Sequence, residues 1–140
     1  MPPTPIRISS PEIDLSGRFQ RYGTVDASPA TNAETVVATL TLADFGNLSV
    51  VSGIMLRGWL AFTVGTSGTA ATLKLHQTNA AGTLIKSSGA TTVTAANLLE
   101  MSIQGFDAAP GIGAYALTLQ ITGGAAASTV SAVELTAFII

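Results

Sequence analysis

Apolar and polar side chains alternate along most of this 140-residue chain, and that period of two constrains the fold more than any other feature. The run at 114–122, for example, reads AYALTLQIT, in which every second residue is large and apolar. Successive side chains of a strand point to opposite faces, so such a run predicts a strand with one buried face. No segment shows an apolar repeat of 3.6 residues bounded by helix caps. We therefore predict an all-β protein.

Eight such runs follow one another from residue 34 to the end of the chain. They are 34–42, 50–64, 71–77, 83–87, 91–94, 98–106, 114–122 and 129–140. Short strands at intervals of about 8–12 residues are typical of a sandwich or barrel. We predict an eight-stranded antiparallel β-sandwich over residues 34–140, with hairpin turns at the glycines of 111–113 and 123–124. An immunoglobulin-like sandwich is the nearest alternative topology.

Residues 1–33 differ from the rest, because five of the six prolines and three of the six basic residues lie there. Proline fixes φ and removes a backbone donor, so this segment is predicted to be an extended N-terminal arm. Its large apolar groups favour an ordered arm that reaches a neighbouring subunit over a flexible tail. The arm residues predicted to contact another subunit are Ile6, Ile8, Arg18, Phe19, Arg21 and Tyr22.

Charge is scarce: charged residues make up 10% of the chain and the net charge is −2, against about 25% charged residues in an ordinary domain. Either other subunits cover much of the surface, or Thr, Ser and Asn keep it polar without charge. Without clustered Lys and Arg, nucleic-acid binding is not expected. No apolar run approaches the ~18 residues of a membrane helix, so no membrane partner is expected.

Reactive groups are equally scarce. The absence of Cys rules out thiolate zinc sites, iron–sulfur clusters and thiol catalysis. His76 is the one imidazole and is predicted to be a surface residue beside Lys74. The carboxylates are scattered singly, which gives no acid–base pair and no calcium-loop spacing. We therefore predict no catalytic site, no metal and no cofactor, and we do not expect an enzyme.

Met55, Arg57 and Trp59 fall on the same face of the longest strand, opposite its apolar face. Exposed Trp and Arg are typical of protein interfaces, so these three residues are predicted to form a contact patch. Two other interpretations stay open. The face could pack beneath the N-terminal arm, or Trp59 could stack on a sugar.

The segments LRGWLAFTVGT (56–66), TLKLHQ (72–77) and AAGTLI (80–85) resemble those of small bacteriophage virion proteins. The eight-strand count with an N-terminal extension likewise resembles the single jelly-roll fold of virion proteins. The resemblance implies a capsid decoration (cement) protein, made in the host cytoplasm and carried on the virion surface. Its implied partners are copies of itself, expected as a homotrimer, and the major capsid protein. The alternative is a receptor- or carbohydrate-binding module of a phage fibre or spike.

Overall fold

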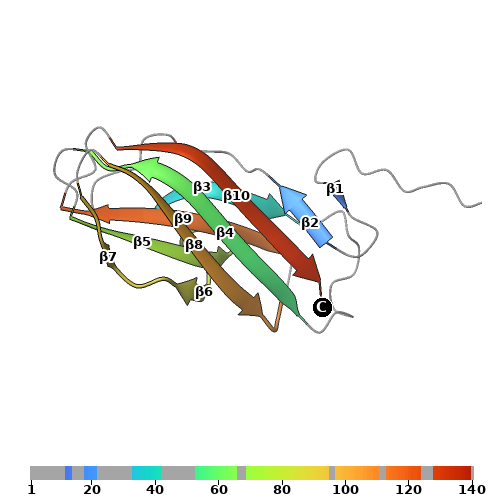
Figure 1. The fold of residues 1–140 in the computed structure, drawn as a ribbon. Helices are drawn as coiled ribbons and strands as arrows, with labels where there is room; N and C mark the ends of the chain where they lie inside the picture. Colours follow the sequence, from blue (N-terminus) through green and yellow to red (C-terminus); the bar gives the residue numbers. More distant parts are fainter. Residues whose placement is uncertain are drawn as a thin grey trace, which may run out of the picture.

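The computed structural model describes residues 12–13, 18–21, 33–41, 53–65, 69–94, 97–110, 113–123 and 128–139. Within these ranges the chain forms ten strands and no helix, as Figure 1 shows. Every strand pair is antiparallel, and the strands form two sheets that pack face to face. The predictions of an all-β protein and of two antiparallel sheets are confirmed.

The first sheet, here called sheet A, has the strand order β1-β2-β10-β4-β8. Its strands are β1 (Glu12–Ile13), β2 (Arg18–Arg21), β10 (Thr129–Ile139), β4 (Ile54–Thr63) and β8 (Leu98–Asp107). The second, sheet B, has the order β3-β9-β5-β6, with the short β7 also paired to β5. Its strands are β3 (Thr35–Thr41), β9 (Ala114–Thr122), β5 (Ala70–Gln77), β6 (Leu84–Ser87) and β7 (Thr91–Thr92).

The strand pairs are nested in sequence. β5 pairs with β6, β4 with β8, β3 with β9, and β2 with β10. The links from β8 to β9 and from β9 to β10 therefore pass from one sheet to the other. The predicted hairpins at 111–113 and 123–124 are wrong for this reason, because a glycine-rich link between sheets carries the same sequence signal as a hairpin turn.

Eight of the ten strands lie between residues 34 and 140, as predicted. Alternation predicts that one face of the 34–42 run carries Val36, Ala38, Leu40 and Leu42. The pairing of β3 with β9, however, changes register between Val36 and Ala38. The extra residue places Val37 in the core at 0% exposure and leaves Val36 half-buried. A β-bulge breaks strict alternation, which explains the error.

The range predicted as the arm contributes two strands, β1 and β2, to sheet A. Arg18, Phe19 and Arg21 lie in β2, whose backbone pairs with β10 from Leu135 to Phe138. Ile6, Ile8 and Tyr22 lie outside the described residues. The division at residue 33 and the contacts of these six residues with another subunit stay predictions. Removing residues 1–33 would, however, remove two strands of sheet A.

The core lies between the sheets and consists of the inward side chains of both. Ile54, Leu56, Leu60, Phe62 and Val64 are each 0% exposed, as the alternation of β4 predicts. A glycine inside a strand pattern predicts a bulge or bend, but at Gly58 the pairing of β4 with β8 continues without a shift. A Cβ at Gly58 would lie 3.0 Å from the Leu117 side chain of the facing sheet. The residue therefore permits close approach of the two sheets.

Candidate functional site

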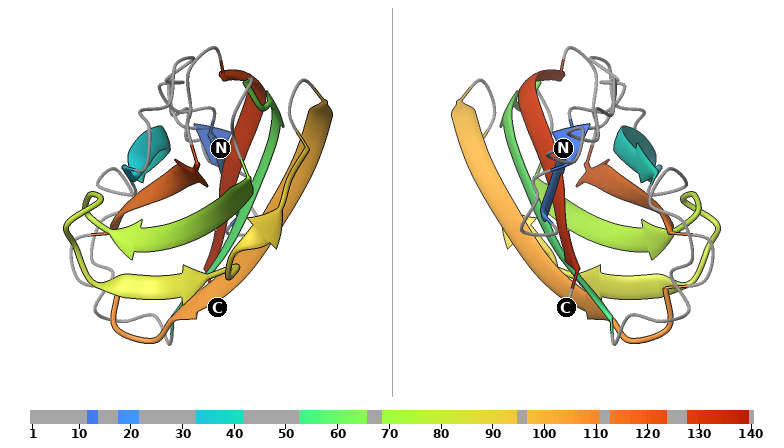
Figure 2. Two further views of the ribbon diagram at one scale, coloured as in Figure 1. Left: turned by 90° about the vertical axis from the view of Figure 1, so that its left-hand side faces the viewer. Right: turned by 90° about the vertical axis from the view of Figure 1, so that its right-hand side faces the viewer.

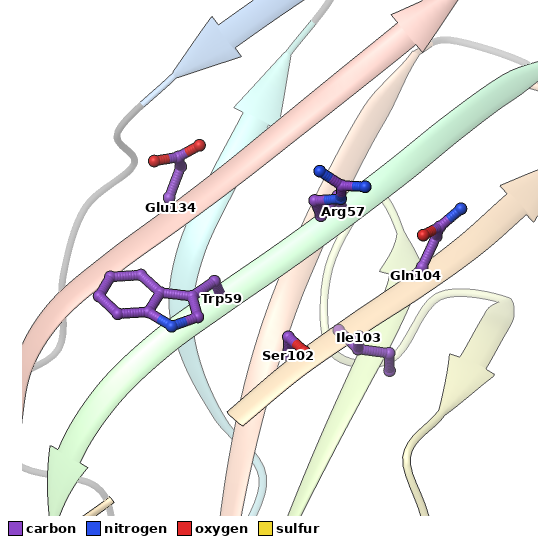
Figure 3. A pocket seen from close by; sticks show the side chains of 6 residues that line it. All are labelled: Arg57, Trp59, Ser102, Ile103, Gln104 and Glu134. Atoms are coloured by element: carbon purple, nitrogen blue, oxygen red, sulfur yellow. The ribbon is translucent and has the colours of Figure 1, made fainter. Parts of the chain in front are cut away.

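The outer face of sheet A carries a hollow of about 510 Å³, here called the Trp59 hollow. Strand pairing brings its residues together: Trp59 of β4 lies opposite Glu134 of β10 on one side and Ser102 of β8 on the other. Arg57 and Gln104 form the next row along the strands. The residues that line it are Arg57, Trp59, Ser102, Ile103, Gln104 and Glu134, as Figure 3 shows.

The polar groups of the Trp59 hollow are largely uncommitted. Arg57 is exposed, and its guanidinium forms no ion pair or hydrogen bond with a described residue; the same holds for the indole N–H of Trp59. Glu134 accepts one bond from Thr136 Oγ1 at 3.1 Å. The hollow thus offers one aromatic ring, a free cationic donor and a carboxylate acceptor to whatever binds there.

The structure places all three predicted patch residues on this outer face. Arg57 and Trp59 line the hollow, and Met55 lies one row away, where Gln104 Nε2 approaches its sulfur at 3.3 Å. The described strands of the arm range, β1 and β2, extend sheet A beside β10 and do not lie over this face (Figure 1). A contact role for the patch stays a prediction.

Sequence reasoning missed the contributions of β8 and β10 to the hollow. Alternation puts Leu99, Met101 and Ile103 on one side of the 98–106 run, which implies the opposite side for Ser102 and Gln104. It could not show that β8 and β10 flank β4, because strand order is a property of the whole chain. No local signal links Glu134 with Trp59, which are 75 positions apart in sequence.

The outer face of sheet B carries a second polar group, here called the Glu34 cluster. Glu34 Oε1 accepts a bond from Lys74 Nζ at 2.7 Å, and Oε2 lies 2.9 Å from His76 Nε2. Thr118 Oγ1 donates to the same Oε2 at 3.2 Å. His76 is 6% exposed, so the prediction of a surface histidine is wrong. The ring does point outward, but Glu34 and the turn at Gly82 enclose it.

Both ring nitrogens of His76 face acceptors. Nε2 faces the Glu34 carboxylate, and Nδ1 lies 3.1 Å from the carbonyl oxygen of Gly82. A neutral imidazole can donate to only one of these acceptors, whereas a protonated ring donates to both. Thr118 donates to Glu34 and not to the imidazole, so among the described residues no hydroxyl is hydrogen-bonded to the ring. The cluster is suited to hold the fold together and not to activate a nucleophile.

The pKa of Glu34 follows from this geometry. Partial burial by itself would raise it, but the hydrogen bonds from Lys74 and His76 and the charge of Lys74 favour the carboxylate, and the pKa lies below its ordinary value. Glu34 lies just before β3, while Lys74 and His76 are on β5. The cluster therefore spans sheet B across the intervening strand β9, from which Thr118 contributes.

A third polar group joins the two sheets at the end of β8. Asp107 Oδ2 accepts bonds from Tyr115 Oη at 2.8 Å and Gln77 Nε2 at 2.9 Å, and Oδ1 accepts from the Ala109 N–H at 3.0 Å. Burial and the adjacent Asp107 carboxylate both raise the pKa of Tyr115. The phenol therefore stays protonated and keeps donating to Asp107, which makes this contact structural.

Neither a metal site nor a membrane-spanning helix is found in the described part of the chain. No three His, Cys, Asp or Glu residues there are grouped so that they could bind an ion. The described residues include no helix that is long and apolar enough to cross a bilayer.

Comparison with known proteins identifies a fold and no family. No protein-family model matches the sequence, and no curated protein matches it. The T13 particle structure of infectious bursal disease virus matches with a TM-score of 0.60 at 11% identity, over 98% of this chain and 36% of that chain. The Gx strain of the same virus matches with a TM-score of 0.58 at 12% identity, over 99% and 36%.

A VP2 subviral particle of this virus matches with a TM-score of 0.56 at 14% identity, over 98% of this chain and 37% of that chain. The present chain thus spans little more than a third of the length of these viral chains. At such low identity the likeness concerns the fold alone. The chain therefore has a two-sheet β-sandwich fold similar to a part of these viral particle proteins.

Proposed function

We propose that this protein is a structural virion protein, a decoration (cement) subunit that binds a phage capsid surface as a homotrimer. The nested strand pairing is the observation that carries the proposal. Pairs β2–β10, β3–β9, β4–β8 and β5–β6 describe one long hairpin folded across two sheets, and this nesting supports our assignment of a jelly roll. Jelly rolls are common in viral capsid domains.

The strand roles in this proposed jelly roll differ from those expected from the sequence. The first strand of the roll is β2, from the arm range, and the interrupted pair β6 and β7 fills one strand position beside β5. The fold likeness to infectious bursal disease virus particle proteins supports the same topology. It supports a structural role in a virion and gives no support for a particular host.

The small number of uncommitted reactive and charged side chains supports a role in assembly. The hydrogen-bonded groups Glu34–His76 and Asp107–Tyr115 are occupied within the fold, and the chain has a net charge of only −2. The Trp59 hollow combines an aromatic ring with an uncommitted Arg57, the residue types that dominate binding energy at protein interfaces. We propose that this hollow contacts the major capsid protein and that the arm reaches a neighbouring subunit.

Mass spectrometry of gradient-purified particles of the encoding virus tests the proposal. We expect the chain in a constant copy number per capsid, and we expect particles stripped of it to break at a lower temperature. Its absence from purified particles would overturn the proposal.

The arm has its own test, which spares β2. A variant without residues 1–11 keeps both described arm strands, and we expect it to fold but to lose binding to stripped particles. Sedimentation of the variant with the particles measures this. Undiminished binding would reject a role for the arm.

A second candidate function is carbohydrate binding by a fibre or spike module, and the Trp59 hollow specifically favours it. An indole face beside Arg57, Gln104 and Glu134 could stack on a sugar ring while the polar groups bind its hydroxyls. A glycan array tests it. A clear signal that Trp59→Ala abolishes would support the sugar-binding module over the cement subunit.

A further inference from the structure

Strand β8 forms one edge of sheet A. Among the described strands it pairs with β4 alone, and Figure 2 shows it as the outermost strand of its sheet. The pairing with β4 runs through ten residue pairs from Leu98 to Asp107 without a register shift. β8 is therefore a long, regular strand whose second row of backbone N–H and C=O groups faces away from the sheet.

Most of the usual protections of an edge strand are missing from β8. Its sequence, LLEMSIQGFD, contains no Lys, Arg or Pro, and it has no β-bulge against β4. Its two charged residues are Glu100 on the outer face and Asp107 at the last position, whose carboxylate is bonded within the fold to Tyr115 and Gln77. Large apolar side chains are exposed at both of its ends: Leu98 is 65% and Phe106 47% exposed. On the inner face Leu99 and Met101 are only partly buried. A long edge with exposed apolar groups and few charges is a template for pairing with another strand.

The sequence of β8 is complementary to itself. Consider two copies that run antiparallel about a centre at Ser102. Each residue of one copy then lies opposite the residue of the other copy that is equally far from Ser102 on its other side. On the outer face Leu98 then faces Phe106, and Glu100 faces Gln104. On the inner face Met101 faces Ile103. Apolar groups meet apolar groups, and each carboxylate meets an amide donor.

Neighbouring registers lack this match. Centring the pair on Glu100 places two carboxylates directly opposite each other, which is destabilising. Centring it on Gln104 places Leu98 opposite position 110, beyond the end of the strand, so one exposed apolar group loses its partner. Centring it on Met101 places Leu98 opposite Gln104 and Glu100 opposite Ser102, so the exposed apolar group meets an amide. Centring it on Ile103 places Glu100 opposite Phe106 and Leu99 opposite Asp107, so two carboxylates meet apolar groups. The Ser102 register is thus distinguished by side-chain chemistry.

We infer that β8 is the contact between two copies of this chain, paired antiparallel about a two-fold axis at Ser102. The pairing joins two five-stranded sheets A into one continuous sheet. It also sets the two Trp59 hollows side by side on one face, because Ser102 lines each hollow. Such a contact uses the same surface of both copies. The proposed homotrimer would need a different, head-to-tail surface. The two-fold contact through β8 is therefore inferred independently of the proposed function.

Cysteine cross-linking of the full chain tests the register directly, because the chain has no cysteine of its own. In the inferred pair the two Ser102 Cα atoms lie within about 4.5–5.5 Å, a distance that a disulfide spans. Mild oxidation of Ser102→Cys is expected to give a covalent dimer in high yield. Glu100→Cys is the matched control, since four residues of offset separate its two copies by about 14 Å. Equal yields from the two variants would overturn the inference.

Charge substitution provides a second test in solution. Gln104→Lys places a cation opposite Glu100 in both halves of the pair, and Gln104→Glu places a second anion there. Relative to wild type, the dimer dissociation constant from sedimentation should fall for the first and rise for the second, each by roughly 2- to 30-fold. Identical constants for both variants would reject the Ser102 register. A wild-type chain that stays monomeric at all concentrations, as it would if β8 paired only with a strand of another protein, would reject the self-contact.

Discussion

The outer faces of the two sheets use their polar residues in opposite ways. On sheet B, Glu34 binds Lys74, His76 and Thr118, and the cluster is largely buried. On sheet A, the side chains of Arg57 and Trp59 line an open hollow and bind no described residue. Polar groups that are satisfied within the chain contribute to stability, whereas unsatisfied exposed groups are available to a partner. The two faces thus differ in that the polar groups of one are satisfied within the chain, whereas those of the other are uncommitted; recognition by the second face is our proposal.

The largest effect is expected from His76→Ala on sheet B. The substitution removes the ring that lies between Glu34 Oε2 and the Gly82 carbonyl oxygen, leaves Thr118 as the remaining donor to Oε2, and opens a space beside β9. We expect a loss of about 2–3 kcal/mol in the free energy of unfolding, measured by chemical denaturation. Lys86→Ala, on an exposed position of the same sheet, is the control and should change it by less than about 0.5 kcal/mol. Similar values for both variants would contradict a stabilising role for the cluster.

Trp59→Ala, on sheet A, should affect binding to particles and not the stability of the fold. We expect binding to particles to weaken by about 2 kcal/mol, roughly 30-fold, because a half-buried indole is a typical interface anchor. Quantitative sedimentation with stripped particles measures the change, and chemical denaturation shows whether the fold survives. Unchanged particle binding by a folded variant would remove the hollow from the proposed capsid contact.

The pH dependence of the free energy of unfolding tests the stabilising role of the sheet B face, and this measurement needs no binding partner. The folded pKa of Glu34 lies below its ordinary value of 4.5, so its carboxylate contributes stability that is present above that value. The contribution is lost as the pH falls through the lowered folded pKa. We expect wild type to lose stability more steeply below about pH 4.5 than Glu34→Gln, in denaturation series at several pH values. Parallel curves would mean that the carboxylate contacts do not stabilise the fold in solution.

The smallest effect is expected from Arg57→Gln. Its guanidinium binds no described residue, so the free energy of unfolding should change by less than about 0.5 kcal/mol. Thermal and chemical denaturation measure this. A loss of more than 1 kcal/mol would show that sheet A also depends on its outer polar groups, and it would weaken the comparison of the two faces.

Prediction from sequence succeeded where a property is local to one strand. The inward faces of β4 and β9 and the outward positions of Arg57 and Trp59 follow from alternation, and the structure agrees. It failed at Val37, where a bulge changes the alternation, and at His76, where the alternation was right but the exposure was wrong. Exposure of an outward side chain depends on what covers it, and Glu34 covers His76 from 42 positions away in sequence.

The sequence by itself determined that this chain forms strands, which side chains of most strands point inward, and that reactive groups are few. Those properties follow from a side-chain period of two and from composition. Only the tertiary structure decided the strand order, the assembly of the Trp59 hollow from three strands, the enclosure of His76 and the position of β8 at an edge. Each of these depends on pairing between residues distant in sequence, and a local pattern of alternation carries no information about its partner strand.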